Sequence, residues 1–175
     1  MLLLTINGFI SLHQISKADA EDIFNTIDTQ RDYLRKWLPF IDNTITIKDT
    51  LTFINDCNTK NEIVFVIRYK LAFAGLIGFK EADNHNKKIE IGYWLSEKFQ
   101  HKGLITSSLK KLIPFAFEYL KMNRIQIKCA VNNLASKRIP QKIGFRYEGI
   151  EREGELLSDG HFTDLEVYSL LRKDA

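Results

Sequence analysis

The segment from Glu90 to Thr106 carries the residues whose types and spacing best fit chemistry. A strand leads through a short turn into a helix that holds a glycine in its first turn. Free backbone N–H groups and the helix dipole make such a helix start an anion site, and Lys98 and Lys102 add positive charge beside it. The alternative is an ordinary strand-to-helix turn in which Gly103 relieves crowding. The sequence holds neither a Walker lysine loop nor a full GxGxxG.

Glu90 lies in a strand whose apolar residues alternate. Four apolar side chains share one face and three residues share the other: Ile89, Ile91, Tyr93 and Leu95 against Glu90, Gly92 and Trp94. If helices cover both faces of the sheet, a carboxylate in a central strand requires a partner or a functional role. The alternative is that water reaches this face at Glu90.

Asn133 and Ser136 stand at the start of another predicted helix. Asn133 is a natural N-cap, and Ser136 would then be an ordinary first-turn residue. A functional interpretation of this pair depends on the other motifs.

Covalent and metal chemistry have little support in the residues. Cys57 and Cys129 lie 72 residues apart (129 − 57), which excludes a disulfide framework of the secreted kind, and each is interpreted as a core residue. No Cys/His or Ser/His/Asp arrangement is visible. The four histidines are too far apart in sequence for a recognisable metal signature, so we expect no metal.

The elements that position these residues form a mixed sheet with helices, an α/β (α+β) fold. Strands are predicted at 9–15, 63–69, 72–80, 88–96, 124–130, 145–152 and 162–171. Helices are predicted at 18–27, 31–38, 48–58, 102–120 and 133–143. The last strand is apolar, so it could serve as the edge of a homo-oligomer or be covered within the molecule.

Length and composition restrict the class of protein. The 175 residues, 45% of them hydrophobic, fit a single domain over residues 1–175 with a sizeable core. A net charge of +3 is too small to indicate nucleic-acid binding. No apolar run reaches the length of a membrane span, and the apolar start lacks the positive region of a signal peptide. We therefore expect a soluble cytoplasmic protein.

Four motifs in order resemble the GCN5-related N-acetyltransferases (GNAT), and within them the ribosomal-protein N-terminal acetyltransferases of the RimJ/RimL type. The motifs are Glu90-Ile-Gly-Tyr-Trp, Gln100-x-x-Gly103, Asn133-x-x-Ser136 and Gly144-Phe145. The resemblance extends over nearly the whole chain, from Arg35-Lys36-Trp37-Leu38-Pro39 to Asp164 and Val167-Tyr168-Ser169-Leu170-Leu171. It implies a mixed, mostly antiparallel central sheet of about seven strands with helices on both faces.

The resemblance also implies acetyl-CoA as co-substrate. The pyrophosphate would be cradled by the backbone of one turn, formed by Gln100, His101, Lys102, Gly103, Leu104, Ile105 and Thr106. Trp94 and Leu95 would hold the pantetheine and acetyl groups by strand-like hydrogen bonds, and Asn133 would bind the pantetheine arm. One departure is Ile105, which stands where the broad family pattern has Gly or Ala.

Acetyl transfer to an amine requires a base, an oxyanion site and support for the leaving thiolate. Glu90 is the predicted general base, acting through water, and a backbone N–H of the Trp94–Leu95 strand would stabilise the oxyanion. By resemblance, Ser136 would protonate the thiolate or hydrogen-bond its sulfur. No covalent enzyme intermediate is needed.

The acceptor is less well defined. Seven acids between residues 148 and 166, Asp164 among them, stand against Arg152 alone, which suits a cationic amine such as a peptide amino terminus or a polyamine. A solvated edge hairpin is the alternative. Trp37 and Leu38 are expected in the opposite wall of the cleft, although core packing would also explain the Trp.

Three hypotheses follow. The first is acetylation of a protein N-terminal α-amine, a ribosomal protein being one candidate. The second is acetylation of a polyamine or another small amine. The third is a non-catalytic acyl-CoA-binding regulatory module.

Overall fold

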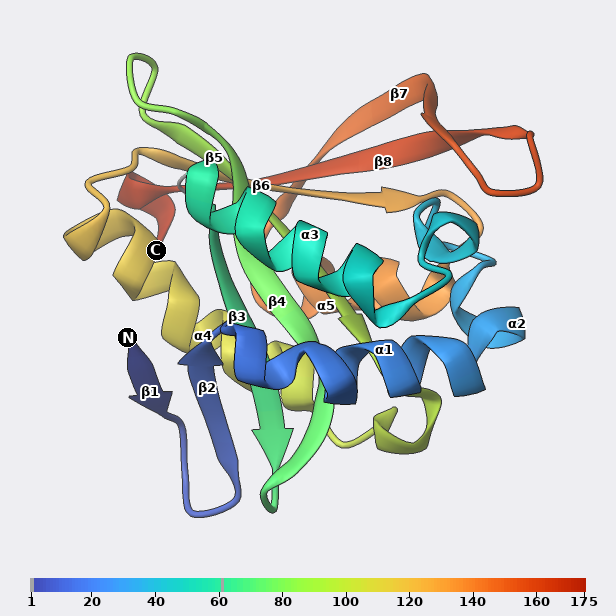
Figure 1. Cartoon of the computed structure of the whole chain (residues 1–175). Helices are drawn as coiled ribbons and strands as arrows, with labels where there is room; N and C mark the ends of the chain where they lie inside the picture. Colours follow the sequence, from blue (N-terminus) through green and yellow to red (C-terminus); the bar gives the residue numbers. More distant parts are fainter. Residues whose placement is uncertain (1, 61) are drawn as a thin grey trace.

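The computed structural model describes residues 2–60 and 62–175 and shows one eight-stranded sheet in the order β1-β2-β3-β4-β5-β6-β8-β7 (Figure 1). The strands are β1 Leu3–Thr5, β2 Ile10–Gln14, β3 Ile63–Tyr69, β4 Ala72–Asp83, β5 Lys88–Leu95, β6 Arg124–Ala130, β7 Arg146–Leu156 and β8 Phe162–Leu171. All neighbours are antiparallel except β5 and β6, which are parallel. The predicted mixed, mostly antiparallel sheet is confirmed.

The predicted count of seven strands was one too low. The additional strand is β1, whose three residues pair with β2 across a hairpin turn. In that turn the Asn7 side chain accepts hydrogen bonds from the backbone of Phe9 and Ile10. Three residues are too few to show an alternating pattern, so the sequence alone carries only the turn signal at Asn7-Gly8.

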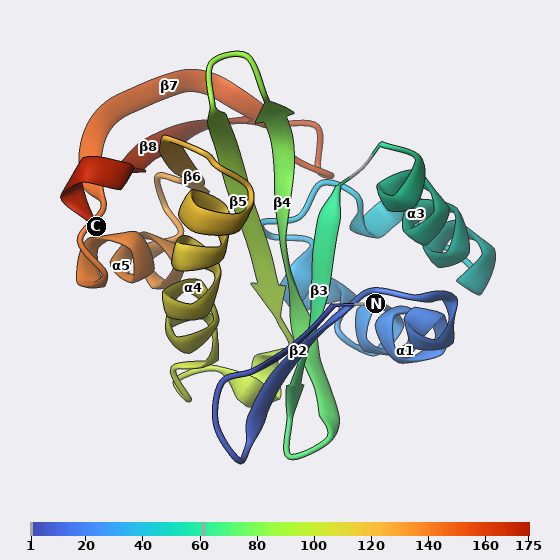
Figure 2. The same ribbon diagram turned by 90° about the vertical axis from the view of Figure 1, so that its left-hand side faces the viewer.

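Helices cover both faces of the sheet, as predicted: α4 and α5 lie on one face and α1 and α3 on the other (Figure 2). Their bounds are α1 Ala20–Thr29, α2 Arg31–Leu34, α3 Ile47–Thr59, α4 Leu104–Pro114 and α5 Leu134–Lys142. The helix predicted over 102–120 is correct in place but changes type after Pro114, where a π-helical turn covers Phe115–Tyr119. In this turn Leu120 N donates to Phe115 O, five residues back, which is the hydrogen bond of a π-helical turn.

Two apolar cores result, one on each face. The larger packs α4 against the sheet and includes the apolar face of β5, with Ile89 and Ile91 buried. The smaller is closed by α1 through Ile23 and Ile27, which are 1% and 2% exposed. Burying each such side chain contributes roughly 1.5–3 kcal/mol. Because the two cores lie on opposite faces of the sheet, their packing holds β5 in place between them.

The last strand, β8, lies inside the sheet. It pairs with β6 on one side and β7 on the other. The alternative that this apolar strand is covered within the molecule is therefore confirmed, and it does not form a free edge for a second copy.

The central feature for the site is the parting of β5 from β6. The two strands pair only from Lys88–Arg124 to Glu90–Gln126, whereas β5 continues to Leu95 along β4. The second half of β5 thus has a neighbouring strand on one side only. Backbone N–H and C=O groups on its other side need partners from elsewhere.

Candidate active site

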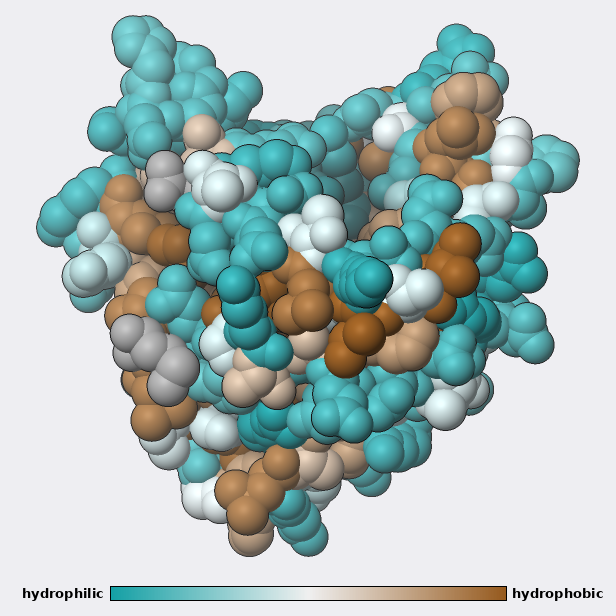
Figure 3. All heavy atoms as spheres, viewed as in Figure 1, coloured by the Kyte–Doolittle hydropathy of each residue, from teal (hydrophilic) through white to brown (hydrophobic). Residues whose placement is uncertain are grey.

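A cavity of about 480 Å³ lies where β5 leaves β6. Six of the residues predicted for the site line it: Trp37, Leu38, Glu90, Trp94, Asn133 and Ser136. The lining does not include Leu95, the turn of residues 100–106 or Asp164. Figure 3 shows the surface hollowed between the tips of the β4–β5 and β7–β8 hairpins.

Glu90 is buried in this site and paired. Its side chain is 5% exposed, with Oε1 2.9 Å from Lys80 Nζ and Oε2 accepting from Gln126 Nε2 at 3.2 Å. Lys128 Nζ is 3.9 Å from Oε2. Burial alone would lower the pKa of Lys80, but the charge and hydrogen bond of Glu90, together with the charges of Glu81 and Glu155, outweigh it and the net pKa is raised. The alternative that Glu90 faces open water is wrong, and its burial is balanced by an ion pair.

A second carboxylate, Glu155 of β7, lines the same cavity. Burial raises its pKa, the charge of Lys80 opposes this, and the charge of Glu90 adds to it, so that the net pKa is raised. The structure gives Glu155 no ion pair within the residues it describes. Sequence reasoning missed this residue as an individual site, counting it only among the acids of the hairpin.

Ser136 is held at the start of α5 by Asn133. Asn133 Oδ1 accepts a hydrogen bond from Ser136 N at 3.1 Å, which confirms the N-cap interpretation. Tyr93 Oη lies 3.2 Å from Ser136 Oγ. Cys129 also lines the cavity, is 5% exposed, and burial raises the pKa of its thiol to about 11. The thiol is therefore protonated at neutral pH, in agreement with its interpretation as a core residue.

The turn of residues 100–106 has the backbone expected of an anion site. His101 and Gly103 both have left-handed φ angles, of 60° and 70°, and no side chain caps α4 at Gly103. Successive N–H groups in such turns form concavities that bind anions. A Cβ on Gly103 would meet nothing within 4 Å, so glycine serves the φ angle, and the alternative that it relieves crowding is wrong. The Ile105 side chain is 4% exposed and packs in the larger core, away from this surface.

The segment of residues 96–100, which leads into this turn, is fastened to the α1–α2 region by two side chains. Gln30 donates to Ser96 Oγ at 2.9 Å and accepts from Glu97 N at 2.8 Å. Tyr33 Oη accepts from Gln100 Nε2 at 2.5 Å. These contacts join segments more than 60 residues apart, and the alternating patterns used for prediction carry no signal for them.

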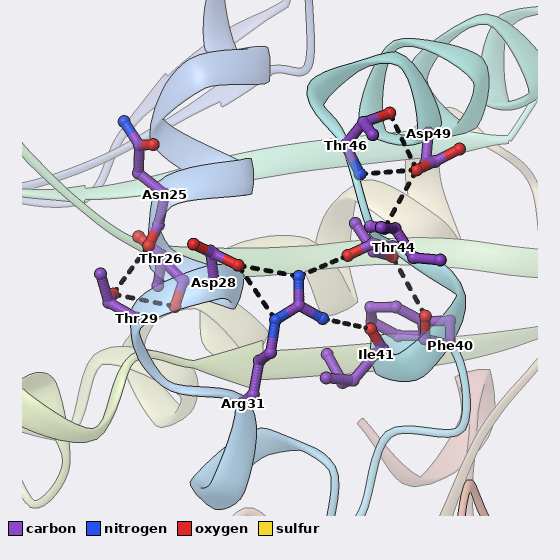
Figure 4. Close-up of polar contacts among 11 residues, drawn as sticks. Asn25, Thr26, Asp28, Thr29, Arg31, Phe40, Ile41, Thr44, Thr46 and Asp49 are labelled. Atoms are coloured by element: carbon purple, nitrogen blue, oxygen red, sulfur yellow. Dashed lines mark hydrogen bonds and ion pairs between the residues drawn. The ribbon is translucent and has the colours of Figure 1, made fainter.

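The helical side of the cavity is formed by the segment after α2. Trp37, Leu38, Pro39 and Phe40 all line the cavity, and Trp37 is half-buried, outside both cores, so the core alternative for this Trp is wrong. Arg31 fastens the segment by donating to the carbonyl oxygens of Ile41 at 2.9 Å and Thr44 at 2.7 Å, while Asp28 pairs with it (Figure 4).

Most acids of the β7–β8 hairpin have partners in the protein itself. Glu148 pairs with Arg124, Glu151 with Lys128 at 2.8 Å, and Glu166 with Lys137 at 2.5 Å. Asp164 Oδ1 accepts from Glu153 N at 2.7 Å, which holds a bulge of β7. The basic side chains of β6 and α5 thus neutralise much of the predicted acidic patch. The negative charge that faces the cavity comes from individual carboxylates and not from a continuous patch.

The described residues were also compared with the requirements of a metal site and of a membrane-spanning helix. Within residues 2–60 and 62–175, no group of three or more His, Cys, Asp or Glu side chains is placed to hold a metal ion. None of the helices described there combines the length and apolar character needed to cross a bilayer.

Comparison with known proteins identifies the family. The acetyltransferase (GNAT) domain model matches residues 10–146. "Putative ribosomal N-acetyltransferase YdaF" of Bacillus subtilis (strain 168) is 37% identical, with 97% of this chain and 94% of that protein covered. The ribosomal-protein-serine acetyltransferase of Escherichia coli (strain K12) is 26% identical, with 94% and 93% covered.

A solved structure is similar to this chain in sequence and in fold. The microcin C7 self-immunity acetyltransferase MccE, in complex with acetyl-CoA and AMP, is 30% identical, covers 95% of this chain and 94% of its own, and superposes with a TM-score of 0.89. The resemblance read from the four motifs is confirmed, and the chain belongs to the GNAT family of N-acetyltransferases.

Proposed function

We propose that the protein transfers the acetyl group of acetyl-CoA to the N-terminal α-amine of a protein, with ribosomal proteins as the first acceptors to test. The observation that carries the proposal is the cavity beside the half of β5 that no longer pairs with β6, where Glu90, Trp94 and Ser136 surround one space. The names of the two relatives, and the acetyl-CoA bound by MccE, support it.

The free side of β5 suits the pantetheine arm. An extended chain of amides there would add to the sheet as a strand does, satisfying backbone groups near Trp94 and Leu95. The left-handed turn and uncapped start of α4 suit the pyrophosphate, with Lys98 and Lys102 beside it. Because Asn133 Oδ1 is engaged in the helix cap, its NH₂ is the group left to donate to the arm.

Two carboxylates are candidates for the general base. Glu90 was predicted for this role, and it stays a prediction. Its two oxygens already bind Lys80 and Gln126, and proton uptake would break the ion pair. Glu155 has a raised pKa and no such pair in the described structure. We therefore rank Glu155 as the stronger base, with Glu90 holding Lys80 in place.

The transfer needs no covalent enzyme intermediate. The base takes a proton from the acceptor amine, whose nitrogen attacks the thioester carbon. A backbone N–H of the Trp94–Leu95 strand stabilises the oxyanion, and Ser136 hydrogen-bonds the departing sulfur. Trp37 and Leu38 flank the acceptor on the helical side. Asp164 lies outside the cavity, and its predicted contact with substrate stays a prediction.

The test is release of free thiol from acetyl-CoA in the presence of defined amines. A peptide with a free N-terminal serine should be acetylated, whereas the same peptide blocked at its N-terminus but carrying a lysine should not. Spermidine in a third reaction tests the polyamine hypothesis. Thiol release with spermidine or the blocked peptide alone would overturn α-amine specificity. Coenzyme binding without release for any amine would overturn the transferase proposal.

The choice of base is tested by pH profiles. A base must be deprotonated, so kcat/KM should fall as pH drops below its pKa. Glu155→Gln should remove this acid limb and lower the plateau by roughly 10²–10⁴-fold. Glu90→Gln should keep the limb. The reverse pattern would restore Glu90 as the base.

A further inference from the structure

The phenol of Tyr93 makes contacts that the transfer steps above do not use. Tyr93 Oη lies 3.2 Å from Ser136 Oγ and 3.3 Å from the Ser136 carbonyl oxygen. Tyr93 projects from the apolar face of β5 and packs against the larger core. It can reach α5 because β6 stops pairing with β5 after Glu90. Tyr93 and Ser136 both line the cavity.

A count of protons limits the possible arrangements. The phenol has one proton, and burial raises the pKa of Tyr93, so that proton is retained at neutral pH. If it is donated to the Ser136 carbonyl, the Ser136 hydroxyl can donate to Tyr93 and is engaged. If it is donated to Ser136 Oγ, the hydroxyl proton of Ser136 is not engaged by Tyr93 and can point into the cavity, where the Cys129 thiol is its other neighbour.

We propose that Tyr93 is a positioning residue for the leaving group: by donating to Ser136 Oγ, it directs the Ser136 hydroxyl proton toward the sulfur of the coenzyme. This inference rests on the proposed function. As the carbon–sulfur bond breaks, its electron pair stays on sulfur, and the Ser136 O–H hydrogen-bonds the resulting thiolate. Solvent later protonates the thiolate, so no proton leaves Ser136. The two hydrogen bonds form a chain in which each strengthens the other.

The test is a double-mutant cycle measured in single turnover with saturating acetyl-CoA, so that product release does not mask the chemical step. Tyr93→Phe removes one oxygen and keeps the ring; the rate should fall roughly three- to tenfold, with the KM for acetyl-CoA unchanged. Ser136→Ala should cost at least as much. The double variant should be no slower than Ser136→Ala, because Tyr93 acts only through Ser136.

Controls separate this role from a structural one. Tyr119→Phe removes the same atom from a residue that is 67% exposed and outside the cavity, and its rate should equal that of the parent. If Tyr93→Phe lowers the melting temperature strongly, 3-fluorotyrosine at position 93 replaces it. Fluorine makes the phenol a stronger donor, and the rate should hold or rise.

Three outcomes would overturn the proposal. They are a full rate in Tyr93→Phe, a Tyr93→Phe penalty that persists undiminished in the Ser136→Ala background, and a change confined to KM. Failure of the proposed function is distinguishable, because there the parent protein itself releases no thiol with any amine.

Discussion

Gly75 of β4 pairs with Leu95 of β5, in the segment assigned to pantetheine and acetyl binding. A Cβ at this position would lie 2.2 Å from the Trp94 carbonyl oxygen and 2.9 Å from Leu95 Cα. Its φ angle of 156° is also one that L side chains rarely adopt. The substitution Gly75→Ala therefore strikes the segment of β5 assigned to pantetheine and acetyl binding.

The magnitude follows from the geometry. Real Cβ atoms essentially never approach a neighbour within 3.0 Å, so the added Cβ and the Trp94 carbonyl oxygen must separate by at least 0.8 Å (3.0 − 2.2), through a shift of β4, β5 or both. Overpacking of this kind costs about 1–3 kcal/mol, and the unfavourable φ adds on the order of 1–3 kcal/mol. The two costs together are about 2–6 kcal/mol, so at about 2–4 °C per kcal/mol for a chain of this size we expect the melting temperature to fall by roughly 4–24 °C. A displacement near 1 Å can cost about 10²-fold in rate.

The assay compares Gly75→Ala with Gly8→Ala, whose Cβ would meet nothing within 4 Å. Melting temperature gives the stability change, and kcat/KM for acetyl-CoA, measured well below both melting temperatures, gives the functional one. Gly8→Ala should match the parent in both. If Gly75→Ala also matches the parent, the close approach to Trp94 does not shape the site and the reasoning is wrong.

Three further predictions concern other contacts. Tyr33→Phe removes the partner of Gln100 and should raise the Kd for CoA about three- to tenfold in titration calorimetry; an unchanged Kd would refute a role in shaping the turn. Arg31→Ala frees two carbonyls and should cost about 2 kcal/mol in urea unfolding while raising the acceptor KM; a change in neither would contradict the wall assignment. A hydrogen bond from Arg124 holds the pKa of Glu148 at about 2, below its usual 4.5, so its stabilisation is present above pH 4.5 and lost as pH falls toward 2. Glu148→Gln should flatten the unfolding free energy across that window, and an unaltered slope would exclude the pair as its cause.

Patterns of side-chain alternation in the sequence were sufficient to predict the structure of elements that bury one face. The two faces of β5 were predicted correctly, because Ile89 and Ile91 enter the core while Glu90 faces the cavity. The Asn133 cap was predictable because capping acts over three residues. Such features depend on neighbours in the chain, which the sequence displays directly.

Features that depend on register or distant pairing were not predictable in this way. The position of Glu155 depends on an irregularity of β7, where four steps from Glu151 to Glu155 pair with only two steps of β8, from Leu165 to Thr163. The neutralising partners of the hairpin acids sit on β6 and α5, so charge counted along the chain overstated the acidity of the site. Lys80 opposite Glu90 could have been found from the hairpin register.

The short pairing between β5 and β6 also has a mechanical consequence. Only three residue pairs join the β1–β5 part of the sheet to the β6–β8 part, whereas seven join β6 to β8. We expect a ladder this short to open more readily than the β6–β8 ladder beside it, and the cavity lies where the pairing of β5 with β6 ends. Amide hydrogen exchange near residues 88–90 and 124–126 would report its opening. A molecule bound along β5 would hold the two parts of the sheet together. We therefore expect binding at this site to reduce the opening of the β5–β6 ladder.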